Sequence, residues 1–107
     1  MPARIADIKS RARLNEREIA DALAVSSQTL WRWKRGSAPP TDQREKLLDL
    51  HWITERLSTV FEPEDVNLWL YERHPRLGNQ RPVDLIRRGE VEPVVELVDQ
   101  LSTGAYI

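Results

Sequence analysis

Few side chains in this sequence are able to do acid–base or metal chemistry. His51 and Glu55 lie four residues apart in a stretch of helical periodicity, which would supply two ligands of a metal site. A metal site needs further ligands, and the other histidine, His74, lies far along the chain. We therefore interpret His51 and Glu55 as a packed or solvated pair, and we predict no metal site and no cofactor.

Enzyme motifs are also missing from the chain. It contains no Cys, which excludes thiol chemistry and disulfides and fits a reducing cytoplasm. No HExxH or Walker-type motif is present. Arg87 and Arg88 precede Gly89 and could bind an anion, but cations at this place commonly complement the C-terminus of a helix. We predict that the protein is not an enzyme.

A different chemistry, the recognition of base edges, is available between Ser27 and Arg35. At helical spacing Gln28 and Arg32 share one face with Arg35, and this face is polar and basic. Side-chain amide and guanidinium groups on such a helix can hydrogen-bond to bases in a DNA major groove. Trp31 falls on the same outer face, where it would contact DNA sugar or another subunit; the alternative is a buried Trp31.

Two short helices joined by a tight turn are needed to position this face. Asn15 followed by Glu18 predicts a capping box at the start of the first helix. Ser27 is expected to cap the second helix, and Gly36 is expected to end it. The stretch therefore has the pattern of a helix-turn-helix.

The rest of the chain also has helical periodicity, and no stretch alternates with a period of two. Thr41 is the expected N-cap of a long helix, with Trp52 in its core-facing stripe. We predict an all-α fold in three parts: a three-helix unit with the helix-turn-helix over 1–40, a connecting helix over 41–61, and a small helical domain over 62–107. Besides the helix-turn-helix, the expected helices cover about 3–13, 42–61, 63–72, 82–88 and 90–103.

Charge is distributed unevenly along the 107 residues. Residues 1–36 carry eight Lys or Arg and four Asp or Glu, a net charge of +4, whereas residues 37–107 carry eight and thirteen, a net charge of −5. Either the two parts meet different partners or their helix faces are simply solvated. No apolar run is long enough to span a membrane, so we expect no membrane partner and a cytoplasmic location.

The pattern from Glu16 to Arg35 resembles the Xre-type helix-turn-helix of bacterial repressors. Ala24 departs from it, because the family usually has Gly in this turn, and a left-handed backbone costs another residue roughly 1 kcal/mol. The turn therefore either differs from that of the family or is mildly strained. The resemblance implies that Gln28 reads adenine, Arg32 reads guanine, and Lys34 and Arg35 contact phosphate. The alternative is a helix-turn-helix used only for packing. The full set of implied DNA-binding residues is Ser27, Gln28, Thr29, Trp31, Arg32, Lys34 and Arg35.

The second half resembles the C-terminal toxin-binding domain of the Xre/MbcA/ParS antitoxins, and is most similar to MbcA-type antitoxins. The resemblance extends over about residues 62–107. It rests on Pro75-x-Leu77-Gly78, Pro82-x-x-Leu85, Gly89, Val94-Val95, Leu97 and Gly104-x-Tyr106.

Together the two resemblances imply an antitoxin whose partner is a RES-domain toxin that destroys NAD. Such an antitoxin occludes the active site of its toxin and represses its own operon by binding operator DNA, as a homodimer or a larger complex with the toxin. The implied toxin-binding residues are Trp69, Arg76, Leu77, Gly78, Arg81, Gly104, Ala105, Tyr106 and Ile107.

Three alternatives remain open at this point. The tail at Tyr106 and Ile107 enters a cleft of the toxin, or it folds back on its own core. Leu77 and Gly78 contact the partner, or they only shape a loop. The chain as a whole is an antitoxin, a stand-alone helix-turn-helix regulator, or an interaction module whose helix-turn-helix no longer binds DNA.

Overall fold

A computed structural model describes residues 2–104. Within this part of the chain the structure is all-helical, as predicted, apart from one isolated bridge between His74 and Gln80. No helix among these residues is long and apolar enough to cross a membrane. The elements are α1 (Pro2–Ala12), α2 (Glu16–Ala22), α3 (Ser27–Lys34), α4 (Thr41–Leu57), α5 (Pro63–Tyr71), a 3₁₀ helix η1 (Pro75–Leu77), α6 (Pro82–Arg88) and α7 (Glu92–Thr103).

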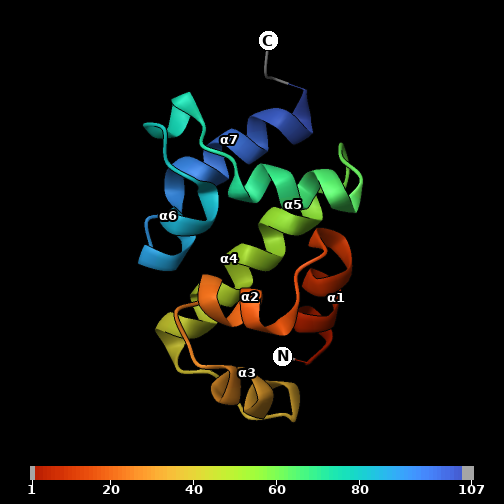
Figure 1. Ribbon diagram of the computed structural model, residues 1–107, viewed down its shortest axis with the longest axis vertical. Coiled ribbons are helices and arrows are strands. Elements are labelled where there is room, and N and C mark those ends of the chain that lie inside the picture. The colour runs from red at the N-terminus through yellow and green to blue at the C-terminus, as the bar shows by residue number, and fades with distance from the viewer. Residues whose placement is uncertain (1, 105–107) are drawn as a thin grey trace.

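The long helix α4 runs through the middle of an elongated molecule measuring 42 × 24 × 19 Å (Figure 1). Helices α1 to α3 gather at one end of it and helices α5 to α7 at the other. Both α1 and α7 pack on α4, and α2 packs on α6. The buried apolar side chains form a single core cluster. Four fully buried residues of α4 lie in that cluster: Leu47, Leu50, Ile53 and Leu57.

The capping box predicted at the start of the helix-turn-helix is confirmed. The Asn15 side chain accepts a hydrogen bond from the Glu18 amide at 2.8 Å, and the Glu18 carboxylate accepts one from the Asn15 amide at 2.9 Å. Ala24 has a left-handed backbone with φ of 58°. The predicted cap of α3 was wrong by one residue, because Ser26 and not Ser27 caps it, accepting from the Thr29 amide at 3.1 Å.

The ends of α4 also differ from the prediction. Thr41 is the first helical residue and Pro40 occupies the N-cap position, so no side chain caps this helix. The helix ends at Leu57, four residues early. The Ser58 hydroxyl donates to the Thr54 carbonyl at 2.7 Å and the Thr59 hydroxyl to the Arg56 carbonyl at 2.7 Å, which satisfies carbonyl groups of the last turn.

Trp52, which was expected in the core, is only partly buried. The Arg56 guanidinium lies 5.0 Å from the centre of its indole ring. The same guanidinium reaches α7, where it donates to Asp99 at 2.9 Å and to Ser102 at 3.0 Å. Trp52 therefore packs under an ion pair that joins α4 to α7.

Candidate functional site

The outer face of α3 is exposed, as a DNA-reading face must be. The side chains of Gln28 and Arg32 point to solvent, and Trp31 is 51% exposed, which decides against the buried alternative for Trp31. The guanidinium of Arg35 lies 4.9 Å from the centre of the Trp31 ring. This cation–π contact keeps a cation over an aromatic surface at one end of the molecule. Figure 1 places α3 at the end opposite α7.

A polar depression of about 430 Å³ adjoins Arg32. The Thr29 hydroxyl accepts a hydrogen bond from Arg32 at 3.4 Å and one from the Ser26 hydroxyl at 2.9 Å. The N-cap and the guanidinium are thus connected through one threonine. The lining comes from α3, the loop after it and the first turns of α4: Thr29, Arg32, Trp33, Ser37, Ala38, Pro40 and Gln43.

Lys34 has a structural partner in addition to its predicted role at phosphate. Its ammonium group pairs with the Glu16 carboxylate, which also pairs with Lys9 at 3.2 Å. Hydrogen bonds from Lys34 and then Lys9 hold the pKa of Glu16 below its usual value. A phosphate contact by Lys34 would therefore compete with an ion pair that ties α3 to the start of α2.

The residues predicted to contact a toxin occupy several different environments. Trp69 is 7% exposed and Leu77 is 5% exposed, so both side chains belong mainly to the core. Arg81 donates two hydrogen bonds of 2.9 Å to Asp84, and these hold the pKa of Asp84 below its usual value. Arg76 is exposed and lines a small depression of about 150 Å³ against α7.

The two glycines of this set have left-handed backbones. Gly78 ends η1 with φ of 66°, and Gly104 ends α7 with φ of 74°. At Gly104 a residue with a side chain would be strained, which fits its predicted place between a helix and a tail. The predicted tail contacts, Ala105, Tyr106 and Ile107, lie outside the described residues.

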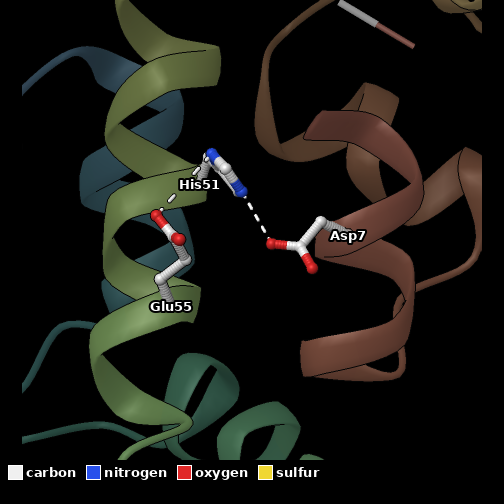
Figure 2. Close-up of side chains that lie close together, drawn as sticks. All are labelled: Asp7, His51 and Glu55. Carbon is white, nitrogen blue, oxygen red and sulfur yellow. Dashed lines mark hydrogen bonds and ion pairs between the residues drawn. The ribbon is translucent and has the colours of Figure 1, made fainter. Parts of the chain in front are cut away.

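A third group of polar residues joins α1 to α4, and the sequence pattern did not reveal it. Figure 2 shows Asp7 of α1 facing His51 and Glu55 of α4. His51 Nε2 lies 2.7 Å from Asp7 Oδ2, and His51 Nδ1 lies 3.8 Å from Glu55 Oε1. Each of the three residues offers one potential ligand atom, and these three atoms lie within 4.8 Å of one another. Asp7 is the third member of this group, beside His51 and Glu55, and the sequence alone did not place it there.

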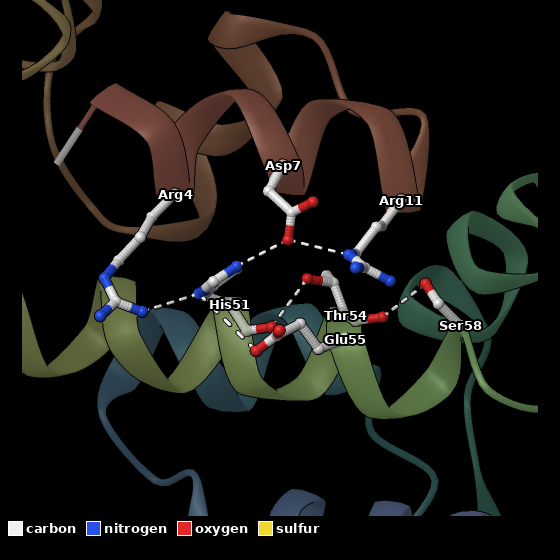
Figure 3. Close-up of polar contacts among 7 residues, drawn as sticks. All are labelled: Arg4, Asp7, Arg11, His51, Thr54, Glu55 and Ser58. Atoms are coloured by element: carbon white, nitrogen blue, oxygen red, sulfur yellow. Dashed lines mark hydrogen bonds and ion pairs between the residues drawn. The ribbon is translucent and has the colours of Figure 1, made fainter.

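Two guanidinium groups surround this cluster (Figure 3). Arg4 donates to His51 Nδ1 at 3.0 Å, and Arg11 donates to Asp7 at 2.8 Å. An arginine only donates, so Nδ1 is the acceptor and Nε2–H donates to Asp7. Burial raises the pKa of Asp7, but the hydrogen bonds from His51 and Arg11 outweigh it and hold that pKa below its usual value.

The cluster is better suited to docking α1 on α4 than to holding a cation. Arg4 occupies the free nitrogen of His51, and a cation bound there would lie beside two guanidinium charges. Thr54 and Ser58 continue the polar seam along α4 through hydrogen bonds to backbone carbonyls. The sequence predicted a packed or solvated pair, and the structure divides it: His51 is packed, with 9% exposure, whereas the Glu55 side chain is 48% exposed.

The fold defined by these elements is that of an antitoxin in a known toxin–antitoxin complex. The chain superposes on MbcA in the crystal structure of the Mycobacterium tuberculosis MbcT–MbcA complex with a TM-score of 0.82. The sequence identity is 24%, and the match covers 99% of this chain and 96% of that chain.

Two relatives that are similar in sequence are also described as mycobacterial cidal antitoxins. The chain is 26% identical over 98 residues to the mycobacterial cidal antitoxin MbcA of M. tuberculosis H37Rv, covering 91% of this chain and 87% of that protein. It is 29% identical over 90 residues to the probable mycobacterial cidal antitoxin Rv3188 of the same strain, covering 84% and 77%. No model of a known protein family matches the sequence. The chain is a homologue of MbcA and Rv3188.

Proposed function

We propose that this chain is the antitoxin of a toxin–antitoxin pair and that it neutralises a RES-domain, NAD-degrading toxin by covering the toxin's active site. The observation that carries the proposal is similarity to MbcA across 91% of the chain together with the shared fold. That similarity extends through both ends of the molecule, so it supports more than a common helix-turn-helix. An antitoxin acts where its toxin acts, so the proposed location is the cytoplasm.

A growth assay tests the proposal directly. The product of the neighbouring gene, which the proposal predicts to be a RES-domain toxin, is expressed with and without this chain, and growth and cellular NAD are measured. We expect the toxin alone to stop growth and deplete NAD, and co-expression to restore both. Failure of the full chain to restore growth, although both proteins are produced, would contradict the proposed function.

The proposed toxin-facing surface is the end that carries α7, with the tail 105–107 entering the active site. Gly104 supports this proposal, because its left-handed backbone ends α7 directly before the tail. The exposed Arg76 lies against the same helix. Removal of residues 105–107 should weaken neutralisation while the melting temperature stays within about 2 °C of that of the full chain. Full protection by the truncated chain would remove the tail from the mechanism.

We further propose that a homodimer, alone or bound to toxin, represses its own operon through α3. The exposed face with Gln28, Arg32 and the Trp31–Arg35 pair supports this function. The proposal is tested by fluorescence anisotropy with a labelled fragment of the promoter. Binding should fall steeply with salt, and Arg32→Ala should cost about 1–3 kcal/mol.

A matched control removes an arginine of equal charge at the other end of the molecule. Arg73→Ala deletes an exposed guanidinium in the loop after α5 and should leave promoter affinity within twofold. Equal losses in both variants would indicate a general charge effect. No loss in Arg32→Ala would count against α3 as the recognition helix and would favour a helix-turn-helix that serves only for packing.

A further inference from the structure

We propose that a groove along α5 receives a large apolar side chain of the toxin, presented on a segment rich in Lys or Arg. The inference rests on the proposed antitoxin function and adds a second contact surface to it. The groove has a volume of about 210 Å³ and is lined by Phe61, Asp65, Leu68, Trp69 and Glu72. Of these residues, the sequence had indicated only Trp69.

The floor of the groove is apolar and unusually open to solvent. Leu68 is 55% exposed, and Val60 in the preceding turn is 46% exposed. The third large apolar residue that is exposed in the described part of the chain, Trp31, lies on α3. Leu68 is therefore left in water on α5, although Val66 and Leu70 of the same helix are fully buried. A large apolar side chain that is exposed and lines a groove, as Leu68 does, is typical of a protein interface.

The rim of the groove is acidic, which fixes the charge of the occupant. Asp65 and Glu72 line it, and Glu62 lies in the turn before α5. Within residues 2–104 these three carboxylates make no ion pair, whereas the neighbouring Glu64 pairs with Arg13 at 2.8 Å. Helix α5 itself contains no Lys or Arg. Unpaired carboxylates around an apolar floor favour an apolar side chain flanked by basic residues.

A second copy of this chain fits the groove poorly. In a two-fold symmetric dimer the same patch meets itself, so Asp65 and Glu72 would approach their own copies. Like charges brought together across an interface cost several kcal/mol. The charge of the rim thus favours a different protein over self-association through α5.

The groove is preformed, which lowers the cost of filling it. The His74 ring packs on the Trp69 ring with 4.7 Å between centroids, and His74 Nε2–H donates to the Trp69 carbonyl at 2.9 Å. The His74 amide in turn donates to Gln80 at 3.2 Å. The loop that follows α5 therefore holds Trp69 in place before any partner binds. Little conformational entropy of the Trp69 side chain remains to be lost on binding.

The test measures the affinity of the purified toxin for the full chain by isothermal titration calorimetry. Leu68→Glu should weaken binding about tenfold or more, because it places a charge in the apolar floor. The double variant Asp65→Lys with Glu72→Lys should weaken it by a similar factor at low salt and less at high salt. Ala6→Glu, an exposed apolar-to-acid change on α1, is the matched control and should stay within twofold.

Two further measurements make the outcome decisive. Thermal melts should show all variants folded, since the altered side chains are exposed, and Leu68→Ser provides a second, uncharged change at the same site. Toxin binding unaffected by any α5 variant would overturn this inference and leave the antitoxin function intact. No binding by the unaltered chain would overturn both. Loss of a dimer by Leu68→Glu, seen by sedimentation of the chain alone, would assign the groove to a second copy and overturn the inference.

Discussion

The two ends of the molecule begin and end their helices by different means. In the end that contains α1 to α3, side chains cap the two helices of the helix-turn-helix: Asn15 with Glu18 on α2, and Ser26 on α3. Helix α1 begins at Pro2. In the end that contains α5 to α7, each helix instead has a proline in its first two positions and no side-chain cap. A proline there has no N–H to leave unsatisfied, so a cap is less needed.

The left-handed turns differ in the same way. Arg13 and Ala24 adopt positive φ of 50° and 58° at the first end, where neither residue is favoured. The first end also has one glycine with positive φ, Gly36. At the second end most of the described residues with positive φ are glycines, among them Gly89 and Gly104, which end α6 and α7 at little steric cost. The exception there is Asn79, with φ of 59°, and asparagine tolerates this conformation better than Arg or Ala. Each non-glycine residue in this conformation costs roughly 1–2 kcal/mol.

The strained turns of the first end are held by side chains from the second end. The Asn67 amide of α5 donates to the carbonyls of Ala12 and Arg13 at 3.0 and 3.2 Å. Arg87 of α6 pairs with the Asp21 carboxylate at 2.6 Å and also donates to the Asp21 carbonyl, close to the turn at Ala24. Hydrogen bonds from α5 and α6 therefore brace the chain at both ends of α2.

The largest effect is expected from the core that the two ends share. Leu50 of α4 is fully buried in the common cluster, so Leu50→Ala should destabilise the protein by about 2–5 kcal/mol. Because both ends pack on α4, unfolding should remain a single transition when followed by circular dichroism and by tryptophan fluorescence in urea. Two separated transitions would mean that the ends fold independently.

A smaller effect is expected at the polar seam between α1 and α4. Asp7→Ala leaves the Nε2–H of His51 without its acceptor, and it should cost about 1–3 kcal/mol in urea unfolding. Asp7→Asn keeps an acceptor and should cost less. Equal losses in the two variants would indicate that the charge of Asp7, rather than its hydrogen bond to His51, stabilises the seam.

Substituting one left-handed residue at each end should change the free energy of unfolding by about 1 kcal/mol, in opposite directions for the two variants. Ala24→Gly relieves a left-handed alanine and should stabilise, whereas Gly89→Ala creates one and should destabilise. A Cβ at Gly89 would meet only the Lys46 side chain at 3.7 Å, so backbone strain is the main cost. Thermal melts of both variants check the prediction, and stabilisation by Gly89→Ala would refute it.

The smallest effect is expected from the half-buried Arg81–Asp84 pair, whose loss in Asp84→Asn should cost about 0.2–1 kcal/mol at pH 7. The pKa of Asp84 is lower in the folded protein than its unfolded value of about 4. This contribution is therefore complete above pH 4 and is lost as the pH falls through the folded pKa. Urea unfolding at pH 7 and pH 3 should show the variant and the unaltered chain converging at low pH, and a constant difference would contradict the assignment.

Local sequence signals predicted much of the fold because their causes act within a few residues. The capping box at Asn15, the proline starts at Pro63 and Pro82, and the helix end at Gly89 each depend on one turn of chain. Ser26 and Ser27 are both good caps, so their spacing alone did not decide between them. The early end of α4 depends on hydroxyl contacts to the backbone that apolar periodicity does not encode.

For the candidate site, the sequence located the polar face of α3 but not the partners of its side chains. Helical spacing puts Gln28 and Arg32 on one face, and that face is exposed. The pairing of Lys34 with Glu16 crosses between two helices and follows from how the turn at Ala24 folds. The roles of these residues toward DNA, and of the tail residues toward a toxin, stay predictions.

The sequence by itself determined the helices, the capping box at Asn15 and the polar outer face of α3, because periodicity and capping are local. Only the tertiary structure decided which distant side chains meet. Asp7 reaches His51 across 44 positions, Asn67 reaches Ala12 across 55, and Leu68 is left uncovered beside the acidic rim. Such contacts depend on the crossing of α1, α4 and α5, which results from the packing of the whole core and leaves no local pattern.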